Sequence, residues 1–216
     1  PLNIYELKAL NRVAARWLTR FVGTSSTKIV LLTPRHERLF RDAYGIRKTE
    51  VIPHGVFETE TQTGLMDDDK NEAGREAEKI LVFGRLGKNK AIDLVYAAFR
   101  RAQSQLDGKV ELVISTGAHP ANPNLAINTR RQMADLPSVT LLDYIPEQDL
   151  PKWCHAVRFL VLPYLATTGV SGVYHAVARY GTPVVAFDLG EFKELREQGA
   201  GIYLVPFLDE EKLADA

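Results

Sequence analysis

The sequence is poor in cysteine and in long apolar runs. Cys154 is the one cysteine among 216 residues, so an intrachain disulfide is impossible and a cysteine metal cluster is disfavoured. No apolar run reaches the ~18 residues of a transmembrane helix, and no signal peptide is recognisable. These absences favour a cytoplasmic protein without a transmembrane segment.

The chain also lacks net charge, because 27 basic and 27 acidic residues cancel. A general nucleic-acid binder would carry a net positive charge, so we expect no nucleic-acid partner. The sequence begins with Pro1, and its last residues, "LDEEKLADA", resemble the start of a helix that is cut short. We therefore expect a fragment of a longer chain.

The first part of the chain has its own pattern of apolar residues. Residues 2–22 carry apolar side chains at spacings of three and four, which predicts an amphipathic helix. A buried strand over 28–33, a helix that begins at Pro34 and a short strand over 49–55 should follow. Residues 58–78 are polar and acidic, which is typical of a linker or a mobile loop.

From Lys79 onward, apolar strands alternate with helices. The expected strands are 79–84, 110–116, 139–144, 158–163, 183–187 and 201–205. The expected helices lie near 90–106, 123–135, 147–156, 171–180 and 190–198, followed by the helix that is cut short. Continuous apolar strands indicate that helices cover both faces of a parallel sheet. The sequence thus predicts an α/β fold with a doubly wound, Rossmann-like parallel sheet, which binds ligands at the carboxyl ends of its strands.

A basic loop, "FGRLGKNKAIDL", follows the first of these strands. Gly84 and Gly87 allow a tight turn, and Arg85, Lys88 and Lys90 place three cations within six residues. This pattern suits a diphosphate, since arginine grips phosphate oxygens bidentately and lysine adds a point charge. A basic surface loop is the alternative, because the spacing matches neither G-x-G-x-x-G nor the P-loop.

A second loop, "ATTGVSGVYHA" (166–176), has small residues and no carboxylate. Glycines let backbone N–H groups approach a ligand, and a helix N-terminus favours an anion. The candidate anion-binding residues are Thr167, Thr168, Gly169, Val170, Ser171 and Gly172. A capped turn without a ligand is one alternative. A nucleophilic pair of Ser171 and His175 is another, although no G-x-S-x-G motif surrounds Ser171.

Two further strand ends could line the same crevice. "STGAHP" ends the second strand with Gly117 and His119, and "DYIPEQDL" ends the third with Tyr144 and Ile145. Tyr144 and Ile145 could present a ring and backbone polar groups to a flat base, although ordinary turns are the alternative. The acidic triplet in "MDDDK" (66–70) lies in the expected linker, so a solvated loop is favoured over a metal site.

Four segments occur in a characteristic order: "VIPHGVF", "FGRLGKNKAIDLVYAAF", "VTLLDYIPEQDLPKWCHAVRFLVLPY" and "ARYGTPVVAFDLGEFKEL". Over residues 24–216 the series resembles the donor-binding half of retaining GT-B glycosyltransferases, in the group 1 family of sucrose synthases and bacterial mannosyltransferases. The resemblance implies that residues 1–57 end an amino-terminal acceptor domain and that 58–78 form a linker. Residues 79–216 would be a donor-binding domain truncated at its carboxyl end.

The resemblance also implies an activity. A sugar would pass, with retention, from a UDP- or GDP-type donor to a saccharide or other hydroxyl acceptor, without a cofactor or a metal. Arg85 and Lys90 would be catalytic, because they match the cations that stabilise the leaving diphosphate. The other donor-binding candidates are Gly84, Gly117, Tyr144, Ile145, His175 and Glu194, the last in a loop after the fifth strand. The isolated fragment should be inactive, and a missing domain could contact a membrane surface.

One departure from the family pattern concerns two acids. The family usually carries two glutamates, one for the donor sugar and one for the ribose, where this sequence has Thr167 and His175. A neutral histidine can still exchange one hydrogen bond with a ribose hydroxyl. The departure leaves open a non-catalytic nucleotide-sugar-binding relative. A sugar-nucleotide epimerase on the same architecture is a further alternative, although the loops after the second and fourth strands lack the acid/base carboxylates that such enzymes generally need.

Overall fold

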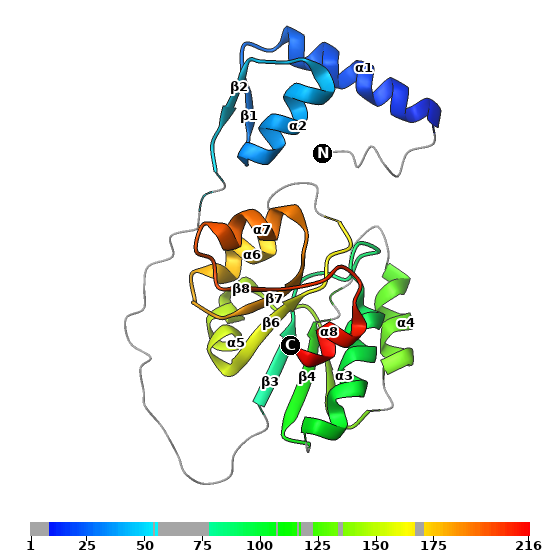
Figure 1. The fold of residues 1–216 in the computed structure, drawn as a ribbon. Coiled ribbons are helices and arrows are strands. Elements are labelled where there is room, and N and C mark those ends of the chain that lie inside the picture. Colours follow the sequence, from blue (N-terminus) through cyan, green and yellow to red (C-terminus); the bar gives the residue numbers. More distant parts are fainter. Residues whose placement is uncertain are drawn as a thin grey trace. The chain divides into compact units, whose positions relative to one another are not determined.

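The computed structural model divides the chain into two units (Figure 1). One comprises residues 1–55 with the short segment 167–171, and the other comprises the rest, including the six-stranded sheet. Each unit is considered by itself. The described residues are 9–53, 55, 78–106, 108–115, 117, 123–133, 136–166 and 171–216. None of the helices in these ranges combines the length and the apolar character that a membrane crossing needs.

The first unit is a small helix–strand arrangement. Its elements are α1 (Ala9–Ser25), β1 (Ile29–Leu31), α2 (Pro34–Tyr44) and β2 (Thr49–Val51), and the two strands pair in parallel. Helix α2 begins at Pro34 because Thr33 caps it, with its side chain accepting a hydrogen bond from the His36 amide. Gly45 ends the helix in the left-handed conformation, at φ +70°. The predicted elements are present in the predicted order, and the start of α2 at Pro34 is confirmed. Helix α1 extends to Ser25 beyond the expected end at residue 22, and β2 ends at Val51 rather than at residue 55. The expected first residues of the first helix, 2–8, lie outside the described residues.

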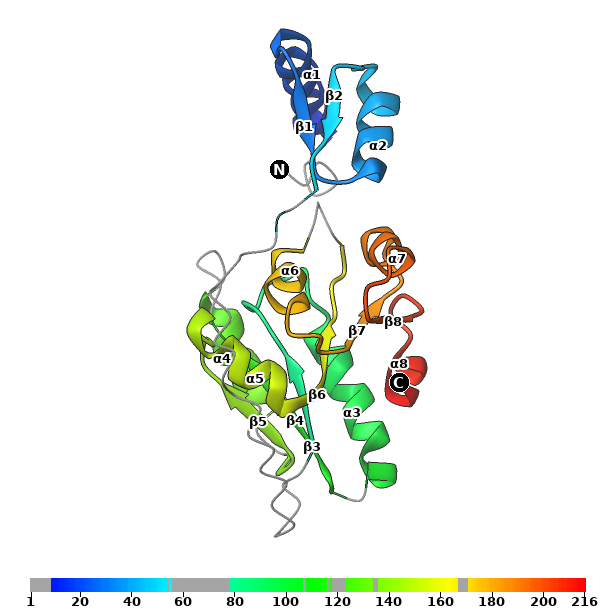
Figure 2. The same ribbon diagram turned by 90° about the vertical axis from the view of Figure 1, so that its left-hand side faces the viewer.

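The second unit confirms the predicted doubly wound sheet. Six parallel strands lie in the order β5-β4-β3-β6-β7-β8, so β5 and β8 form the opposite edges (Figure 2). The strands are β3 (Glu78–Val82), β4 (Val110–Ser115), β5 (Val139–Leu142), β6 (Val157–Leu162), β7 (Val184–Phe187) and β8 (Ile202–Val205). Along the chain these are the first to sixth strands, so the spatial order is 3-2-1-4-5-6, as in dinucleotide-binding folds.

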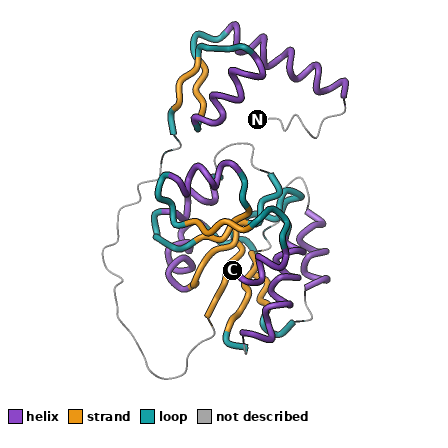
Figure 3. Tube along the Cα trace, in the orientation of Figure 1, coloured by secondary structure: helices purple, strands orange, loops and turns teal. Residues whose placement is uncertain are grey.

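Helices connect successive strands on both sides of the sheet (Figure 3). They are α3 (Ile92–Leu106), α4 (Pro123–Met133), the 3-10 turn η2 (Glu147–Asp149) with α5 (Leu150–Ala156), α6 (Gly172–Ala178), α7 (Gly190–Glu197) and α8 (Glu210–Asp215). Strand order reverses between β3 and β6, and the helices that follow these two strands pack on opposite faces. This reversal creates the switch point at which such folds hold ligands.

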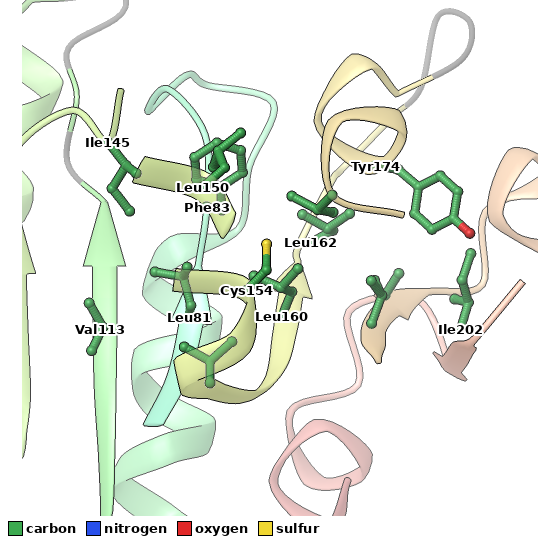
Figure 4. Packing of buried hydrophobic residues seen from close by; sticks show 14 of the residues in the cluster. Leu81, Phe83, Val113, Ile145, Leu150, Cys154, Leu160, Leu162, Tyr174 and Ile202 are labelled. Carbon is green, nitrogen blue, oxygen red and sulfur yellow. The ribbon is translucent and has the colours of Figure 1, made fainter. Parts of the chain in front are cut away.

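Both faces of the sheet are apolar, which explains the continuous apolar strands. Leu81 and Leu160 point to a core shared with α5, α6 and α7, whereas Val82 and Val161 point to a core shared with α3 and α4. Alternation of side chains along each strand separates the two cores. In Figure 4, Cys154 of α5 lies among the leucines of the first core. Its burial raises the pKa of the thiol to about 11, so Cys154 remains protonated at neutral pH.

Two element boundaries differ from the prediction for a local reason. Strand β5 ends at Leu142 rather than near residue 144, because its neighbour β4 ends at Ser115, the pairing partner of Leu142. Helix α6 ends at Ala178 rather than near residue 180, where the chain turns through Gly181 at φ +69°. Tyr144 and Ile145 therefore belong to a loop and not to a strand.

Replacing Leu160 tests the central core. Leu160 has no exposed surface in β6, so Leu160→Ala should lower the free energy of unfolding by about 2–5 kcal/mol, through lost apolar burial and a cavity. Ile127→Ala on α4 is the control, because Ile127 is 50% exposed and should change stability by less than about 0.5 kcal/mol. Urea unfolding followed by circular dichroism measures both. Equal effects would contradict the packing described here.

Candidate functional site

The candidate site lies at the switch point of the sheet, where the chain leaves β3 and β6. Two backbone hydrogen bonds join the segments that follow these strands: Ala91 N–H donates to the Pro163 carbonyl at 2.8 Å, and Leu165 N–H donates to the Asn89 carbonyl at 2.7 Å. Lys90 and Tyr164 thereby face each other in a short antiparallel bridge. The bridge fixes the basic loop to the end of β6.

Lys90 is the most unusual residue of this loop because its ammonium group is buried. Its side chain is 8% exposed, and Nζ donates a hydrogen bond to the Phe83 carbonyl at 3.0 Å. Nζ also lies 5.4 Å from the centre of the Tyr164 ring. No carboxylate within the described ranges forms an ion pair with Lys90. Burial lowers the pKa of Lys90 to about 8, so the group is still mostly protonated at neutral pH.

Gly84 leaves the space that Lys90 occupies. Its φ is +98°, and a Cβ atom there would lie 2.7 Å from Lys90 Nζ and 3.0 Å from Cγ2 of Val173. A side chain at this position would therefore displace the ammonium group in addition to straining the backbone. The glycine is required for the close approach of Lys90 to the end of β3.

Arg85, Gly117 and Tyr144 come together at the ends of β3, β4 and β5. The Arg85 side chain is exposed, and its guanidinium carbon lies 5.2 Å from the centre of the Tyr144 ring. A Cβ atom at Gly117 would lie 3.1 Å from Tyr144, and the Gly117 carbonyl accepts a hydrogen bond from Leu86 N–H at 3.0 Å. Three predicted site residues thus share one surface, with a cation stacked beside an exposed aromatic ring.

The Ile145 side chain is 3% exposed and belongs to the first core with Phe83 and Leu150 (Figure 4). Only its backbone can therefore face a ligand. Among the described residues outside helices and strands, no backbone hydrogen bond uses the amide or the carbonyl of Ile145. These two groups suit recognition of a planar polar edge.

The second predicted loop is described only at its end. Thr167, Thr168, Gly169 and Val170 lie outside the described residues, as do Thr116 and His119 of the loop after β4. The half-buried Ser171 directly precedes α6, and the exposed Gly172 is its first residue. His175, also in α6, is half-buried, with its ring 5.5 Å from that of Tyr174.

Glu194 lies in α7, the helix expected near residues 190–198, and not in the loop that the family resemblance implies. Only Asp188 and Leu189 separate the end of β7 at Phe187 from the start of α7 at Gly190, so Glu194 falls in the second turn of the helix. Its neighbour Glu191, in the first turn, is 3% exposed and more deeply buried than Glu194.

Sequence reasoning did not identify Tyr164 as part of the site. The only feature of the sequence that could have indicated Tyr164 is its position two residues after the end of β6. Within the described ranges, no three His, Cys, Asp or Glu side chains lie close enough together to hold a metal ion. The arrangement of two cations, an aromatic ring and available backbone groups fits an anionic ligand with a planar part.

A cavity of about 480 Å³ lies elsewhere in the second unit and does not belong to this site. Its lining is mostly apolar and comes from α3, α8 and the sheet. It includes Glu78 and Val110, the first residues of β3 and β4. The cavity therefore opens at the amino ends of these strands, whereas Lys90 and Arg85 lie at the carboxyl ends.

Substituting Gly84 should disturb Lys90 as well as the backbone. Gly199 is a matched control, because its φ is +94° and a Cβ atom there would meet nothing within 4 Å. We expect Gly199→Ala to cost about 1–2 kcal/mol of unfolding free energy from the backbone alone. Gly84→Ala should cost clearly more, since it also displaces Lys90 and Val173. Urea unfolding compares them, and equal costs would show that the space around Gly84 is not restricted.

Lys90 should make stability depend on pH in alkaline solution. Its pKa is about 8 in the folded protein against 10.5 for an unperturbed lysine. Between these values the unfolded chain binds more protons than the folded protein, so the free energy of unfolding rises as pH increases from about 8 to 10.5. Over this range the wild-type protein should gain about 3 kcal/mol of unfolding free energy relative to Lys90→Met. Urea unfolding of both proteins across this range measures the difference, which a solvated Lys90 would keep constant.

Solved structures share the fold of this chain. HepE of Anabaena, crystallised with UDP and glucose, superposes with a TM-score of 0.70 at 18% identity, covering 96% of this chain and 56% of HepE. An α,α-trehalose 6-phosphate synthase of Burkholderia multivorans superposes with a TM-score of 0.72 at 18% identity, covering 95% of this chain and 54% of the synthase. TarM superposes with a TM-score of 0.70 at 14% identity, covering 94% of this chain and 38% of TarM. The chain therefore spans little more than half of these proteins, or less.

Sequence comparison gives a more specific result than the shared fold. No curated protein matches the chain. Residues 77–216, however, match the family described as "Glycosyl transferases group 1". These residues include all six strands of the large sheet and both cations of the candidate site. Because the match covers more than half of the sequence, the chain belongs to the group 1 glycosyltransferases.

Proposed function

We propose that the second unit binds the donor of a retaining glycosyltransferase, a sugar linked to a nucleoside diphosphate of the UDP or GDP type. The acceptor would be a saccharide or another hydroxyl compound. The proposal rests first on Lys90, a buried ammonium group at the switch point without a described carboxylate partner. Such a group lowers its electrostatic free energy by binding an anion, because burial has removed its water.

Arg85 would complete the diphosphate site. It lies on the same loop as Lys90, and its exposed guanidinium group can reach phosphate oxygens with two parallel hydrogen bonds. During transfer, the bond between the anomeric carbon and the diphosphate oxygen breaks, and its electron pair remains on the diphosphate. Arg85 and Lys90 would stabilise that developing charge in a partly water-excluded site, which is the role that oriented cations perform best.

The base would bind beside Tyr144 and Ile145. The available amide and carbonyl of Ile145 can pair with a polar base edge, and the exposed Tyr144 ring offers an apolar surface next to it. HepE and the pneumococcal O-GlcNAc transferase GtfA, which share the fold, were crystallised with UDP, and this supports a nucleotide as the ligand. His175 would exchange one hydrogen bond with a ribose hydroxyl.

The missing glutamates favour one alternative, a relative that binds the nucleotide sugar without transferring it. Thr167 and His175 cannot supply a carboxylate to the donor sugar. If that alternative holds, the longer protein would bind a donor yet neither transfer nor hydrolyse its sugar. Release of nucleoside diphosphate by the longer protein, measured with a panel of acceptors, separates the two functions.

Ligand binding by the present chain tests the donor site directly. A thermal-shift screen against UDP, GDP, ADP and their sugar conjugates should show a raised melting temperature for one base, since a ligand that binds only the folded state stabilises it. Titration calorimetry then gives the affinity. Absence of binding by every nucleoside diphosphate at millimolar concentration would refute the donor-site proposal for this chain.

Arg85→Ala should weaken binding of the preferred nucleoside diphosphate by about 2 kcal/mol, or roughly 30-fold, because a charge-assisted hydrogen-bond partner is lost. Arg100→Ala is the matched control. Arg100 makes a similar contact with Tyr96, at 5.9 Å from the ring centre, but belongs to α3 away from the strand ends. Its removal should leave the calorimetric affinity unchanged. Equal losses in both variants would indicate a nonspecific charge effect.

A further inference from the structure

The surroundings of Lys90 raise a question that the diphosphate site alone does not answer. A mostly protonated ammonium group is held at 8% exposure without an ion pair to a described carboxylate. The Phe83 carbonyl accepts one of its three N–H groups. A single neutral hydrogen bond leaves most of the cost of burying a charge uncompensated. Another group must stabilise the cation.

Tyr164 lies where that group is needed. The centre of its ring is 5.4 Å from Lys90 Nζ, within the distance at which an aromatic ring attracts a cation. The backbone bridge between Lys90 and Tyr164 sets this separation, because it places the two residues opposite each other. The centre of the Tyr164 ring also lies 6.1 Å from that of the Phe192 ring, and Phe192 is fully buried in α7. The backbone bridge and the contact with Phe192 both restrict the ring.

We propose that Tyr164 is a positioning residue whose aromatic ring holds the Lys90 ammonium group at the switch point, ready for an anion. The proposal rests on the proposed donor site for its functional consequence, but the contact itself exists without a ligand. Tyr164 acts through Lys90 and is not assigned a contact with the donor.

An aromatic ring is suited to this position for an electrostatic reason. A carboxylate beside Lys90 would hold the cation more strongly, but it would also repel an arriving diphosphate and compete for the same N–H groups. A ring attracts the cation through its quadrupole and carries no net charge. The ring therefore fixes the ammonium group and leaves its attraction for a diphosphate intact.

Two substitutions of Tyr164 distinguish the effect of the aromatic ring from the effect of an apolar side chain of similar size. Tyr164→Phe keeps the ring and removes the hydroxyl group, whereas Tyr164→Leu keeps an apolar side chain and removes the ring. Tyr164→Met serves as a second ring-free variant if the leucine variant does not fold, which circular dichroism decides. Lys90→Met, alone and combined with Tyr164→Leu, completes a double-mutant cycle.

The first measurement needs no ligand. Nuclear magnetic resonance of lysine labelled at Cε and Nζ follows the titration of Lys90, whose signal is assigned by its absence in Lys90→Met. Loss of the ring destabilises only the protonated form, so the pKa of Lys90 should fall by about 0.5–1.5 units in Tyr164→Leu. Tyr164→Phe should restore the wild-type value. An unchanged pKa in the leucine variant would overturn the proposal.

The second measurement is UDP affinity by calorimetry. Tyr164→Leu should weaken UDP binding roughly 3- to 30-fold, and Tyr164→Phe by less than about 2-fold. In the Lys90→Met background, Tyr164→Leu should have no further effect. An equal loss in that background would show that Tyr164 acts independently of Lys90, contrary to the proposal. If the wild-type protein binds no UDP, the same calorimetry is done with GDP and ADP. Absence of binding by all three refutes the donor site, while the titration of Lys90 still decides the role of Tyr164.

Discussion

The pairing of β3 with β4 on one side and β6 on the other determines where every part of the site lies. Backbone hydrogen bonds in the register Leu81–Val113 and Leu81–Leu160 place β3 at the centre of the sheet. The chain leaves β3 and β6 side by side, but α3 and α6 then pack on opposite faces. Folds of this topology bind ligands where the connections diverge in this way, and topology alone brings the basic loop and Tyr164 to that point.

The burial of the Lys90 ammonium group determines the electrostatic character of the site. Lys90 remains at the end of β3 because Gly84 leaves it space, the Phe83 carbonyl accepts a hydrogen bond and the Tyr164 ring lies beside it. Arg85 behaves differently: it stays exposed and lies against the Tyr144 ring. One cation is thus partly desolvated and fixed, and the other is solvated and able to adapt, which are complementary properties for gripping a charged group.

Much of the fold could be predicted from the sequence, because strands buried on both faces leave continuous apolar runs that end at Gly or Pro. Position after a strand selected the basic loop with Arg85, Lys88 and Lys90, and the family resemblance singled out Arg85 and Lys90. Sequence reasoning could not find the contact of Lys90 with Tyr164, since a bridge outside the sheet joins residues far apart in the chain. It also could not show that the Ile145 side chain belongs to the core, because burial in a loop has no periodic signal.

The two hydrogen bonds that join Asn89 to Leu165 and Ala91 to Pro163 have a consequence for the entropy of binding. A flexible loop loses conformational freedom when it closes on a ligand, and that loss subtracts from affinity. Here the basic loop is tied at both ends of Lys90 to the segment leaving a central strand. Its backbone is therefore ordered before any ligand arrives. Most of the loss of conformational entropy thus takes place when the protein folds and not when the ligand binds.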